Sequence, residues 1–383
     1  MTRFVLPRLD PSWLAVPLGN LAQIKYGSAL TSESRAVGGE VPVYGSGGVV
    51  GAHDQALHSE KSIVIGRKGS VGSIFLTKGS FWCIDTAYYL EQLNESVNIE
   101  YLAAYLQSID LSRLSISVAI PGLNRKELSI VPVPLPTLPE QQRIVDVLRQ
   151  AEAVEKAKKS ISDQVDHLIR TAYWEHFGKW FTTDGLIDPV RISDYVADSQ
   201  YGVSEAMGET GTHAVLRMNS ITTSGWLDLS SLKYASLSKK DINSTELRDG
   251  DLLFNRTNSK ELVGKCAVWR PVAGAYSFAS YLVRFRLKPE MLPEYLWATL
   301  NSAYGKYRLL NSAKQAVSMA NVSPTGLGRI MVPLPPLPLQ ESFAKFVREI
   351  ELLRAQMLSK LELYSELQEV ISQRALILSL IHI

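Results

Sequence analysis

Two long stretches of the chain carry apolar residues at heptad spacing. In the first, apolar side chains recur at alternating intervals of three and four, with Lys158 as the interruption, at Ile144, Val147, Ala151, Val154, Ile161, Val165, Leu168 and Ala172. In the second, Lys360 is the interruption and the positions are Phe343, Phe346, Ile350, Leu353, Met357, Tyr364, Leu367 and Ile371. A stripe sustained over several heptads is typical of helices that pack as a coiled coil. We therefore predict long helices within residues 134–178 and 333–378.

Each stripe follows a proline-rich segment that contains a glutamine. The segments are PLPTLPEQQRIV, beginning at Pro134, and PLPPLPLQESFA, beginning at Pro333, which is 199 residues later. Prolines keep the chain extended up to the helix start, because the residue before a proline avoids the helical conformation. Glu140 falls in the first turn, where a negative charge suits the helix dipole. The shared segment indicates an internal repeat.

The residues before each helix also match between the two copies. VPLGNLA from Val16 corresponds to VRISDYV from Val190, and Tyr26-Gly27 corresponds to Tyr201-Gly202. YLAAYLQS, beginning at residue 101, likewise matches YLWATLNS, beginning at residue 295. The offset grows from 174 to 199 residues, so the second copy contains about 25 additional residues. Short β-rich runs such as SIVIG and DLLFN, followed by one helix in each copy, predict α+β units.

We predict an α+β protein with a pseudo-two-fold internal repeat. Two similar globular domains, at residues 1–133 and 179–332, are separated by two long helices, which we expect to form an intramolecular antiparallel coiled coil. A helix of about 39 residues extends over roughly 58 Å, which is longer than one domain of this size needs. The alternative is that each stripe covers only the core of its own domain. The matching lengths and the shared leading segment favour pairing.

The composition is typical of a globular protein. Apolar residues make up 46% of the chain and charged residues 20%, and 383 residues are enough for two cores. The sequence contains no apolar run of the roughly 18 residues that a membrane helix needs, and the first residues lack the pattern of a secretory signal. Cys83 and Cys266 are the two cysteines, and their spacing indicates neither a disulfide framework nor a zinc site. We expect a cytoplasmic protein without a membrane partner.

Positive charge is concentrated in one part of the chain. Residues 185–330 contain 17 Lys and Arg and 13 Asp and Glu, a difference of +4, whereas residues 1–130 contain 11 of each. A nucleic-acid-binding protein with this composition would have to gather its basic groups on one face. The charge is therefore compatible with DNA binding and does not demand it.

The common catalytic motifs are missing from the sequence. GSGGVVG at 45–51 and GRKGSVG at 66–72 lack the spacing of a dinucleotide fingerprint and the GK[ST] ending of a P-loop. The chain contains no HExxH, no GxSxG and no tetrapeptide of the amino-methyltransferase type, and its six histidines are scattered. We expect a non-catalytic chain with no metal site and no bound cofactor.

The polar loops carry side chains suited to base edges and phosphates. The richest is DLLFNRTNSKELVGK at 251–265, where a predicted strand ends at Phe254 and six polar residues follow: Asn255, Arg256, Thr257, Asn258, Ser259 and Lys260. Arginine can pair with guanine and asparagine with adenine, while Ser, Thr and Lys hold phosphates. The composition is equally compatible with an ordinary polar surface turn.

Three further segments and the tyrosine of the second Tyr-Gly pair offer similar chemistry, and the candidate residues are Ser46, Gly47, Gly48, Arg67, Lys68, Ser70, Tyr201, Arg217 and Asn219. IGRKGSVGS at 65–73 occupies the place in the first copy that FNRTNSK occupies in the second, and its glycines allow close approach of a ligand. Residues 43–51 could form a phosphate nest, although a flexible hairpin turn is the favoured interpretation. LRMNSI at 216–221 follows a predicted strand. Tyr26 and Tyr201 could stack on a sugar or base, or belong to the core.

The chain resembles the specificity subunits of type I restriction–modification systems over essentially its whole length. The motifs that carry the resemblance are the two proline segments with their helices, YGSGG, IGRKGSVG, QYGVSEA with VLRMNSI, and GDLLFNRTNSKELVGK. The last two together are the most specific. The second helix start, PLQES in place of PEQQR, departs from the first copy, and the apolar tail LILSLIHI lacks the polar ending expected of the family.

This resemblance implies that the globular units are target recognition domains, each of which reads one half of a split, asymmetric site on double-stranded DNA. It also implies that the loops at 46–48, 67–70, 217–219 and 255–260 approach DNA. The paired helices would set the distance between the half-sites and dock two methyltransferase subunits. S-adenosylmethionine, ATP and Mg²⁺ would then be bound by those partners and by restriction/translocase subunits. The competing hypotheses are a coiled-coil scaffold with two protein-binding domains and a self-contained enzyme.

Overall fold

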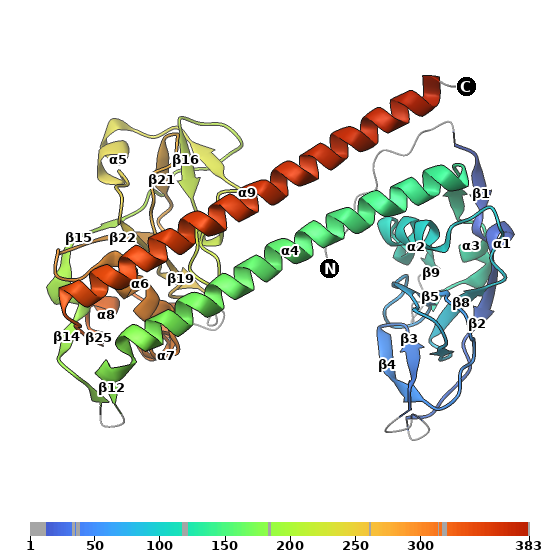
Figure 1. Ribbon diagram of the computed structural model, residues 1–383, viewed down its shortest axis with the longest axis horizontal. Helices are drawn as coiled ribbons and strands as arrows, with labels where there is room; N and C mark the ends of the chain where they lie inside the picture. Colours follow the sequence, from blue (N-terminus) through green and yellow to red (C-terminus); the bar gives the residue numbers. More distant parts are fainter. Residues whose placement is uncertain are drawn as a thin grey trace. The chain divides into compact units, whose positions relative to one another are not determined.

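The structure is a computed structural model, and it describes residues 13–381 except 33–34, 36–38, 117–121, 183–184, 260–261, 313 and 316–319. The chain forms two compact units (Figure 1). Unit 1 comprises Met1–Lys156 with Leu363–Ile383, and unit 2 comprises Ala157–Glu362. The domain ranges predicted from the sequence end where the long helices begin, whereas the compact units divide each long helix between them. Within the described part of the chain, no helix is both long and apolar enough to cross a membrane.

Unit 1 combines short strands with short helices before the first long helix. Its elements are β1 (Ala15–Pro17), α1 (Leu18–Leu21), β2 (Gln23–Tyr26), β3 (Val41–Gly45), β4 (Gly48–His53), β5 (Ile63–Gly66), β6 (Ile74–Leu76), β7 (Trp82–Cys83), β8 (Ala87–Glu91), α2 (Ile99–Ser108), η1 (Leu111–Leu114), β9 (Ser115–Ile116), β10 (Gly122–Leu123), α3 (Arg125–Ser129), β11 (Pro132–Pro134) and the start of α4 (Leu138–Phe177).

Unit 2 begins within α4 and continues into the second long helix. Its elements are η2 (Gly178–Trp180), β12 (Phe181–Thr182), β13 (Gly185–Leu186), β14 (Pro189–Arg191), η3 (Ile192–Tyr195), β15 (Val196–Tyr201), β16 (His213–Leu216), η4 (Met218–Ser220), β17 (Lys233–Ala235), α5 (Lys239–Ser244), β18 (Leu252–Asn255), β19 (Thr257–Asn258), β20 (Cys266–Val268), β21 (Tyr276–Phe278), β22 (Leu282–Leu287), α6 (Pro293–Asn301), α7 (Ala303–Ser312), β23 (Lys314–Gln315), β24 (Ala320–Asn321), α8 (Pro324–Gly328), β25 (Met331–Pro333) and the first part of α9 (Leu337–Ile381).

The same sheet topology occurs in both units. Unit 1 contains an antiparallel sheet in the order β2-β8-β5-β6, and unit 2 contains one in the order β15-β22-β18-β20. Each unit also contains a three-stranded sheet, β4-β3-β7 or β17-β16-β21, in which one neighbour of the middle strand is antiparallel and the other is parallel. The internal repeat in the sequence is therefore a repeat of topology.

A small part of the additional residues of the second copy lies after α6, where the offset between the copies grows from 194 to 199 residues. After α6, unit 2 continues into α7 and the three-stranded sheet β19-β24-β23. After the corresponding helix α2, unit 1 has the shorter η1 and the two-stranded sheet β10-β9. The growth of the offset along the sequence therefore reflects in part an enlarged segment that pairs with the loop after β18.

The proline segments connect each unit to its long helix through two kinds of contact. The strand that leads into each segment pairs with an earlier strand of its own unit: β11 pairs with β1, where Val133 is opposite Val16, and β25 pairs with β14, where Val332 is opposite Val190. A buried tyrosine of α2 or α6 also donates to a proline carbonyl: Tyr101 to Pro134 at 2.7 Å, and Tyr295 to Pro333 at 2.6 Å. The start of the helix is thereby fixed to the core.

The glutamine shared by the two segments is fully buried in each unit. Gln141 Oε1 accepts from the backbone N–H of Asn98, the N-cap of α2, at 2.7 Å, and its Nε2 donates to Ser96 O and Pro136 O. Gln340 repeats this pattern in unit 2, where it accepts from Leu292 at the N-cap of α6 and donates to Glu290 O and Pro335 O. One amide group thus joins the starts of two helices.

Within unit 2, the end of α4 packs against the start of α9, and the two helices run in opposite directions (Figure 1). The ring centroid of Phe343 lies 6.1 Å from that of Tyr173 and 5.2 Å from that of Phe177. Ile169 and Val347 belong to the same buried cluster. These contacts extend the core of the unit onto both long helices.

The predicted stripe needs correction at Leu168, whose side chain is 43% exposed, while Ile169 is 5% exposed. The rings of Tyr173 and Phe177 set the buried face of α4 here, so the face advances in steps of four residues rather than in the alternating steps of a heptad. On α9, four members of the predicted stripe are about half exposed: Leu353, Met357, Tyr364 and Leu367. The side chain of Ile371 lies outside the described residues, and the coiled coil stays a prediction.

Candidate nucleic-acid interface

In unit 1 an arginine directly follows the central strand β5 and lies against an exposed tyrosine. The guanidinium carbon of Arg67 lies 5.1 Å from the ring centroid of Tyr26, the last residue of β2, and 5.8 Å from that of Tyr88. Arg67 Nη1 donates to the carbonyl of Asp85 at 2.9 Å. Arg125, at the start of α3, places a second guanidinium 5.3 Å from the Tyr26 ring. Two cations therefore share one tyrosine that is 49% exposed.

Unit 2 builds the same arrangement with different neighbours. Arg256 follows β18, and its guanidinium carbon lies 5.2 Å from the ring centroid of Tyr201, the last residue of β15, which is 46% exposed. Arg256 Nη1 donates to the carbonyl of Ser280 at 3.3 Å. Asp85 and Ser280 each stand two residues before the next strand of the sheet, β8 or β22. The two arginine–tyrosine stacks are therefore topologically equivalent.

The backbone of the two arginines is held in the same way. The N–H of Arg67 donates to Thr86 O at 2.9 Å, and its carbonyl accepts from the N–H of Leu123. The N–H of Arg256 donates to Tyr281 O at 3.1 Å, and its carbonyl accepts from the N–H of Val322. The backbone N–H and C=O groups of each arginine are therefore both hydrogen-bonded, so the position of its Cα is well defined.

The charge on these arginines has no carboxylate partner in the described part of the chain. Eight other arginines, at positions 113, 143, 149, 248, 270, 284, 286 and 348, form ion pairs with Asp or Glu. Because a charge without a pair attracts anions, the two stacks are positions at which each unit could meet a phosphate. Arg125 was not among the candidate contacts chosen from the sequence, whereas the repeated Tyr-Gly pair had already indicated Tyr26.

The other candidates of unit 1 lie in two neighbouring turns. Ser73 Oγ donates to the carbonyl of Ser70 at 2.9 Å and also to the carbonyl of Ser46, so it links the turn after β3 to the turn after β5. Gly47, Lys68 and Ser70 are exposed and Ser46 is half-buried. These four residues stay candidates for DNA contact.

Gly48 is buried in this arrangement. Its φ is +105°, a conformation that favours glycine, and a Cβ at this position would lie 3.2 Å from the ring of Phe75. The glycine therefore fits the tight hairpin, which was the favoured interpretation of this segment, and contact of Gly48 with DNA stays a prediction.

Arg217 and Asn219 are presented by the short helix η4. Asn219 is exposed, while Arg217 is half-buried and its Nη2 donates to Ser231 O at 2.9 Å. The buried Lys265 holds this helix in place: it is 7% exposed, and its Nζ donates to the carbonyl of Met218 at 2.9 Å and to that of Ile221. Burial, and secondarily the charge of nearby Lys306, lowers the pKa of Lys265. Lys265 was not among the residues chosen from the sequence, although its place directly before an apolar run could have indicated it.

The loop after β18 contains one clear correction. Asn255 is fully buried, and among the described residues neither its Nδ2 nor its Oδ1 has a hydrogen-bond partner. The strand therefore ends at Asn255 and not at the predicted Phe254, which turns the Asn255 side chain inward, and contact of Asn255 with a base stays a prediction.

The remaining residues of this loop are partly accessible. Thr257 and Asn258 form the half-buried strand β19, and Asn258 Oδ1 accepts from the N–H of Ser259 at 2.8 Å. Lys260 lies outside the described residues. Thr257, Asn258 and Ser259 thus stay candidates for DNA contact beside Arg256, and contact of Lys260 with DNA stays a prediction.

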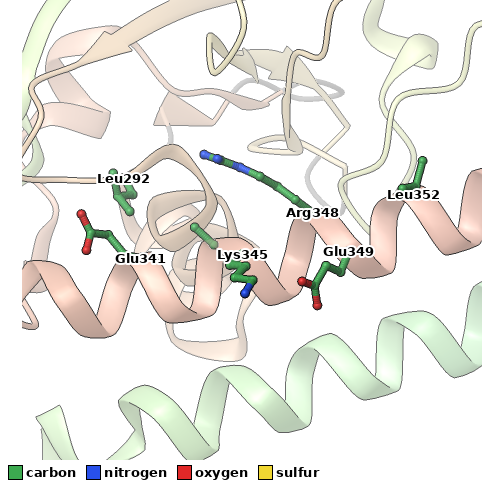
Figure 2. Close-up of a pocket in the computed structure, with 7 residues that line it drawn as sticks. Leu292, Glu341, Lys345, Arg348, Glu349 and Leu352 are labelled. Carbon is green, nitrogen blue, oxygen red and sulfur yellow. The ribbon is translucent and has the colours of Figure 1, made fainter.

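A hollow on α9 within unit 2 differs from these arginine positions. It has a volume of about 520 Å³ and is lined by Leu292, Glu341, Ala344, Lys345, Arg348, Glu349 and Leu352. Figure 2 shows Arg348 pointing away from α9, and its Nε lies 2.6 Å from Glu294 Oε1. Because charges of both signs line this surface, it lacks the excess of positive charge that a nucleic acid requires.

The described residues contain no group of three or more His, Cys, Asp or Glu side chains placed to hold a metal ion.

Two units of one topology, each with an arginine–tyrosine stack at the same strand ends, make this an internally duplicated α+β protein. Residues 12–166 match the family model "Type I restriction modification DNA specificity domain". The chain is 25% identical over 263 residues to the EcoKI specificity subunit of Escherichia coli K12, covering 64% of this chain and 55% of the relative. It is 30% identical over 142 residues to the putative MjaX specificity subunit of Methanocaldococcus jannaschii, covering 36% and 33% respectively.

The fold has a counterpart among solved structures. The type I restriction–modification S subunit from M. genitalium matches with a TM-score of 0.61 at 15% identity, covering 96% of each chain, which is a likeness of fold. The chain spans about half the length of the curated relatives it matches. The chain is thus similar in sequence to type I restriction–modification specificity subunits over part of its length, and similar in fold to one solved S subunit over most of its length.

Proposed function

We propose that the chain is the sequence-specific DNA-binding subunit of a type I restriction–modification complex. Each unit reads one half of a bipartite, asymmetric site on double-stranded DNA. The observation that carries this proposal is the pair of equivalent stacks, Arg67 on Tyr26 and Arg256 on Tyr201, at the same strand ends of two units with one topology. The family description, a DNA specificity domain, supports the same function.

The two long helices have a separate role in this proposal. α4 and α9 pair as an antiparallel coiled coil that sets the distance between the half-sites and docks two methyltransferase subunits. The exposed apolar residues of α9, such as Leu353 and Met357, support this role because a lone helix in water would not favour them. Rigid linkage would also make the second half-site contact effectively intramolecular, so that two modest contacts give a tight complex.

The chemistry of the complex is assigned to partner chains. The chain itself contributes DNA recognition and no catalytic step. S-adenosylmethionine belongs to the methyltransferase subunits, and ATP and Mg²⁺ belong to the restriction/translocase subunits that we expect to join them.

The test is selection from a random duplex library by this chain in complex with its cognate modification subunits. We expect recovery of a split motif with a fixed gap. An intact complex that recovers no motif would contradict the proposal and favour the alternative, a coiled-coil scaffold with two protein-binding units. Methylation or cleavage of DNA by the purified chain without partners would contradict the non-catalytic role.

A further inference from the structure

We propose that Arg67 and Arg256 are equivalent anchors for a DNA backbone phosphate, one for each half-site, and that the side chains around them which differ between the units read the bases. This inference rests on the proposed function. It divides the candidate residues into a shared, sequence-independent contact and a variable reading surface, and it assigns a role to Arg256 different from the base contact suggested by its loop composition.

The first step is the position of the guanidinium groups. Each arginine donates one bond to a carbonyl, Asp85 O or Ser280 O, and lies over a tyrosine that is about half exposed. A guanidinium has five N–H donors, so this single bond leaves most of them available to another acceptor. Because the group is already held, binding through it loses little side-chain entropy.

The second step is the charge. Neither Arg67 nor Arg256 forms an ion pair with Asp or Glu among the described residues, in contrast to arginines such as Arg284 and Arg286 of the same fold. If the only role of this side chain were to donate a hydrogen bond to a carbonyl of a neighbouring segment, an uncharged donor would be sufficient. A phosphate accepts two parallel N–H bonds from a guanidinium and neutralises it.

The third step is what the two units share and what they do not. Two different half-sites differ in their bases and have the same sugar–phosphate backbone, so a contact repeated in both units suits the backbone. The surroundings differ: Arg125 shares the tyrosine in unit 1, whereas Pro324 begins the corresponding helix in unit 2. Lys68 and Ser70 flank the first arginine, while Thr257 and Asn258 flank the second.

The experiment uses the full chain in complex with its cognate modification subunits, and the probe is the random duplex library followed by titration of the selected duplex at several salt concentrations. The variants are Arg67→Ala and Arg256→Ala, with Arg67→Lys and Arg256→Lys as partners that keep the charge. Arg248→Ala is the matched control, because Arg248 is an exposed arginine of unit 2 paired with Glu246.

For each alanine variant we expect affinity to fall about tenfold for all duplexes, with the slope of log K against log salt reduced by about one and the selected motif unchanged. We expect the lysine variants to keep the wild-type salt dependence and to lose less affinity than the alanine variants, and Arg248→Ala to change neither the affinity nor the selected motif.

The inference is overturned if an alanine variant alters the preferred base at one position, or if both alanine variants bind as wild type. Should alanine prevent folding, loss of slope in the lysine variants would overturn it. A wild-type complex that selects no motif overturns the proposed function itself.

Discussion

Asn255 illustrates how a single position differs between the two units. It is fully buried at the end of β18, and no described residue pairs with either polar atom of its carboxamide, while the corresponding end of β5 is Gly66. An unsatisfied buried polar group costs about 1–3 kcal/mol of stability. Unit 2 therefore carries a cost that unit 1 avoids, in the strand that presents Arg256.

Replacing this amide with an apolar side chain of similar shape should remove the cost. We expect Asn255→Leu to raise the free energy of unfolding of unit 2 by about 1 kcal/mol, measured by chemical denaturation. Thr299→Val is the matched control, since the buried Thr299 hydroxyl donates to Tyr295 O and accepts from the Tyr173 hydroxyl. That variant should lower the same free energy, and destabilisation by Asn255→Leu would contradict our account.

Sequence patterns located the arginines and could not describe their surroundings. The repeat placed Arg67 and Arg256 in corresponding loops, because a short strand precedes both. The tyrosines that they contact are distant in the sequence, and their pairing depends on how β2 and β15 join their sheets. Burial of Asn255 was equally hidden, because a polar residue at a strand end and one in a loop look the same in composition.

At the scale of elements, the buried glutamines explain why the same helix start occurs twice. Gln141 and Gln340 each bond to three backbone groups from two segments, and an apolar residue at either position would leave those groups without a partner. In the second copy the sequence PLQES replaces PEQQR, but this difference changes the residues around the buried glutamine and keeps the glutamine itself, Gln340.

We predict that Gln340→Leu lowers the free energy of unfolding by about 2–3 kcal/mol, because three hydrogen bonds are lost and backbone groups stay buried. Gln141→Leu should act alike in unit 1. Gln142→Leu is the control, since Gln142 is the exposed neighbour, and its effect should stay below about 1 kcal/mol. Equal effects of Gln141→Leu and Gln142→Leu in thermal denaturation would argue against the anchoring role.

The tyrosines at the helix starts predict a response to alkaline pH. Burial raises the pKa of Tyr101 and of Tyr295 above the ordinary value. Unfolded tyrosines ionise near pH 10 while these stay protonated in the folded chain, so the unfolded state binds fewer protons and stability falls as pH rises above about 10. Urea titrations at pH 9–11 measure this fall.

The variant Tyr295→Phe should make that fall less steep, because one buried titrating hydroxyl is removed, and it should lower stability at neutral pH through loss of the bond to Pro333 O. Tyr307→Phe, at an exposed tyrosine, should change neither quantity. A pH dependence of Tyr295→Phe identical to that of wild type would contradict this explanation.

The long helices were the most predictable elements, because heptad spacing over four turns or more leaves little choice of structure. They are observed at Leu138–Phe177 and Leu337–Ile381, within a few residues of the predicted 134–178 and 333–378. Their packing was less predictable. The buried face of each helix is set by large aromatic side chains such as Tyr173 and Phe343. A pattern that records only whether a residue is apolar or polar contains no information on side-chain size.

At the scale of the whole molecule, duplication gives the chain two versions of one fold with different loops. Sequence comparison between the halves was sufficient to predict the repeat and the α+β class. It could not predict the additional sheet β19-β24-β23, because strands of two residues carry no periodicity. The central claim is that two related units read two half-sites at a distance set by α4 and α9.

The most direct test inserts one heptad into both helices, after Lys156 in α4 and after Glu362 in α9, where the units divide. Seven residues lengthen a helix by roughly 10 Å, or about 3 base pairs of DNA at 3.4 Å each. Selection from random duplexes by the assembled complex should then return the same two half-site sequences with a gap about 3 base pairs longer. Altered half-site bases, or an unchanged gap, would contradict the claim that the helices set the spacing between two independent readers.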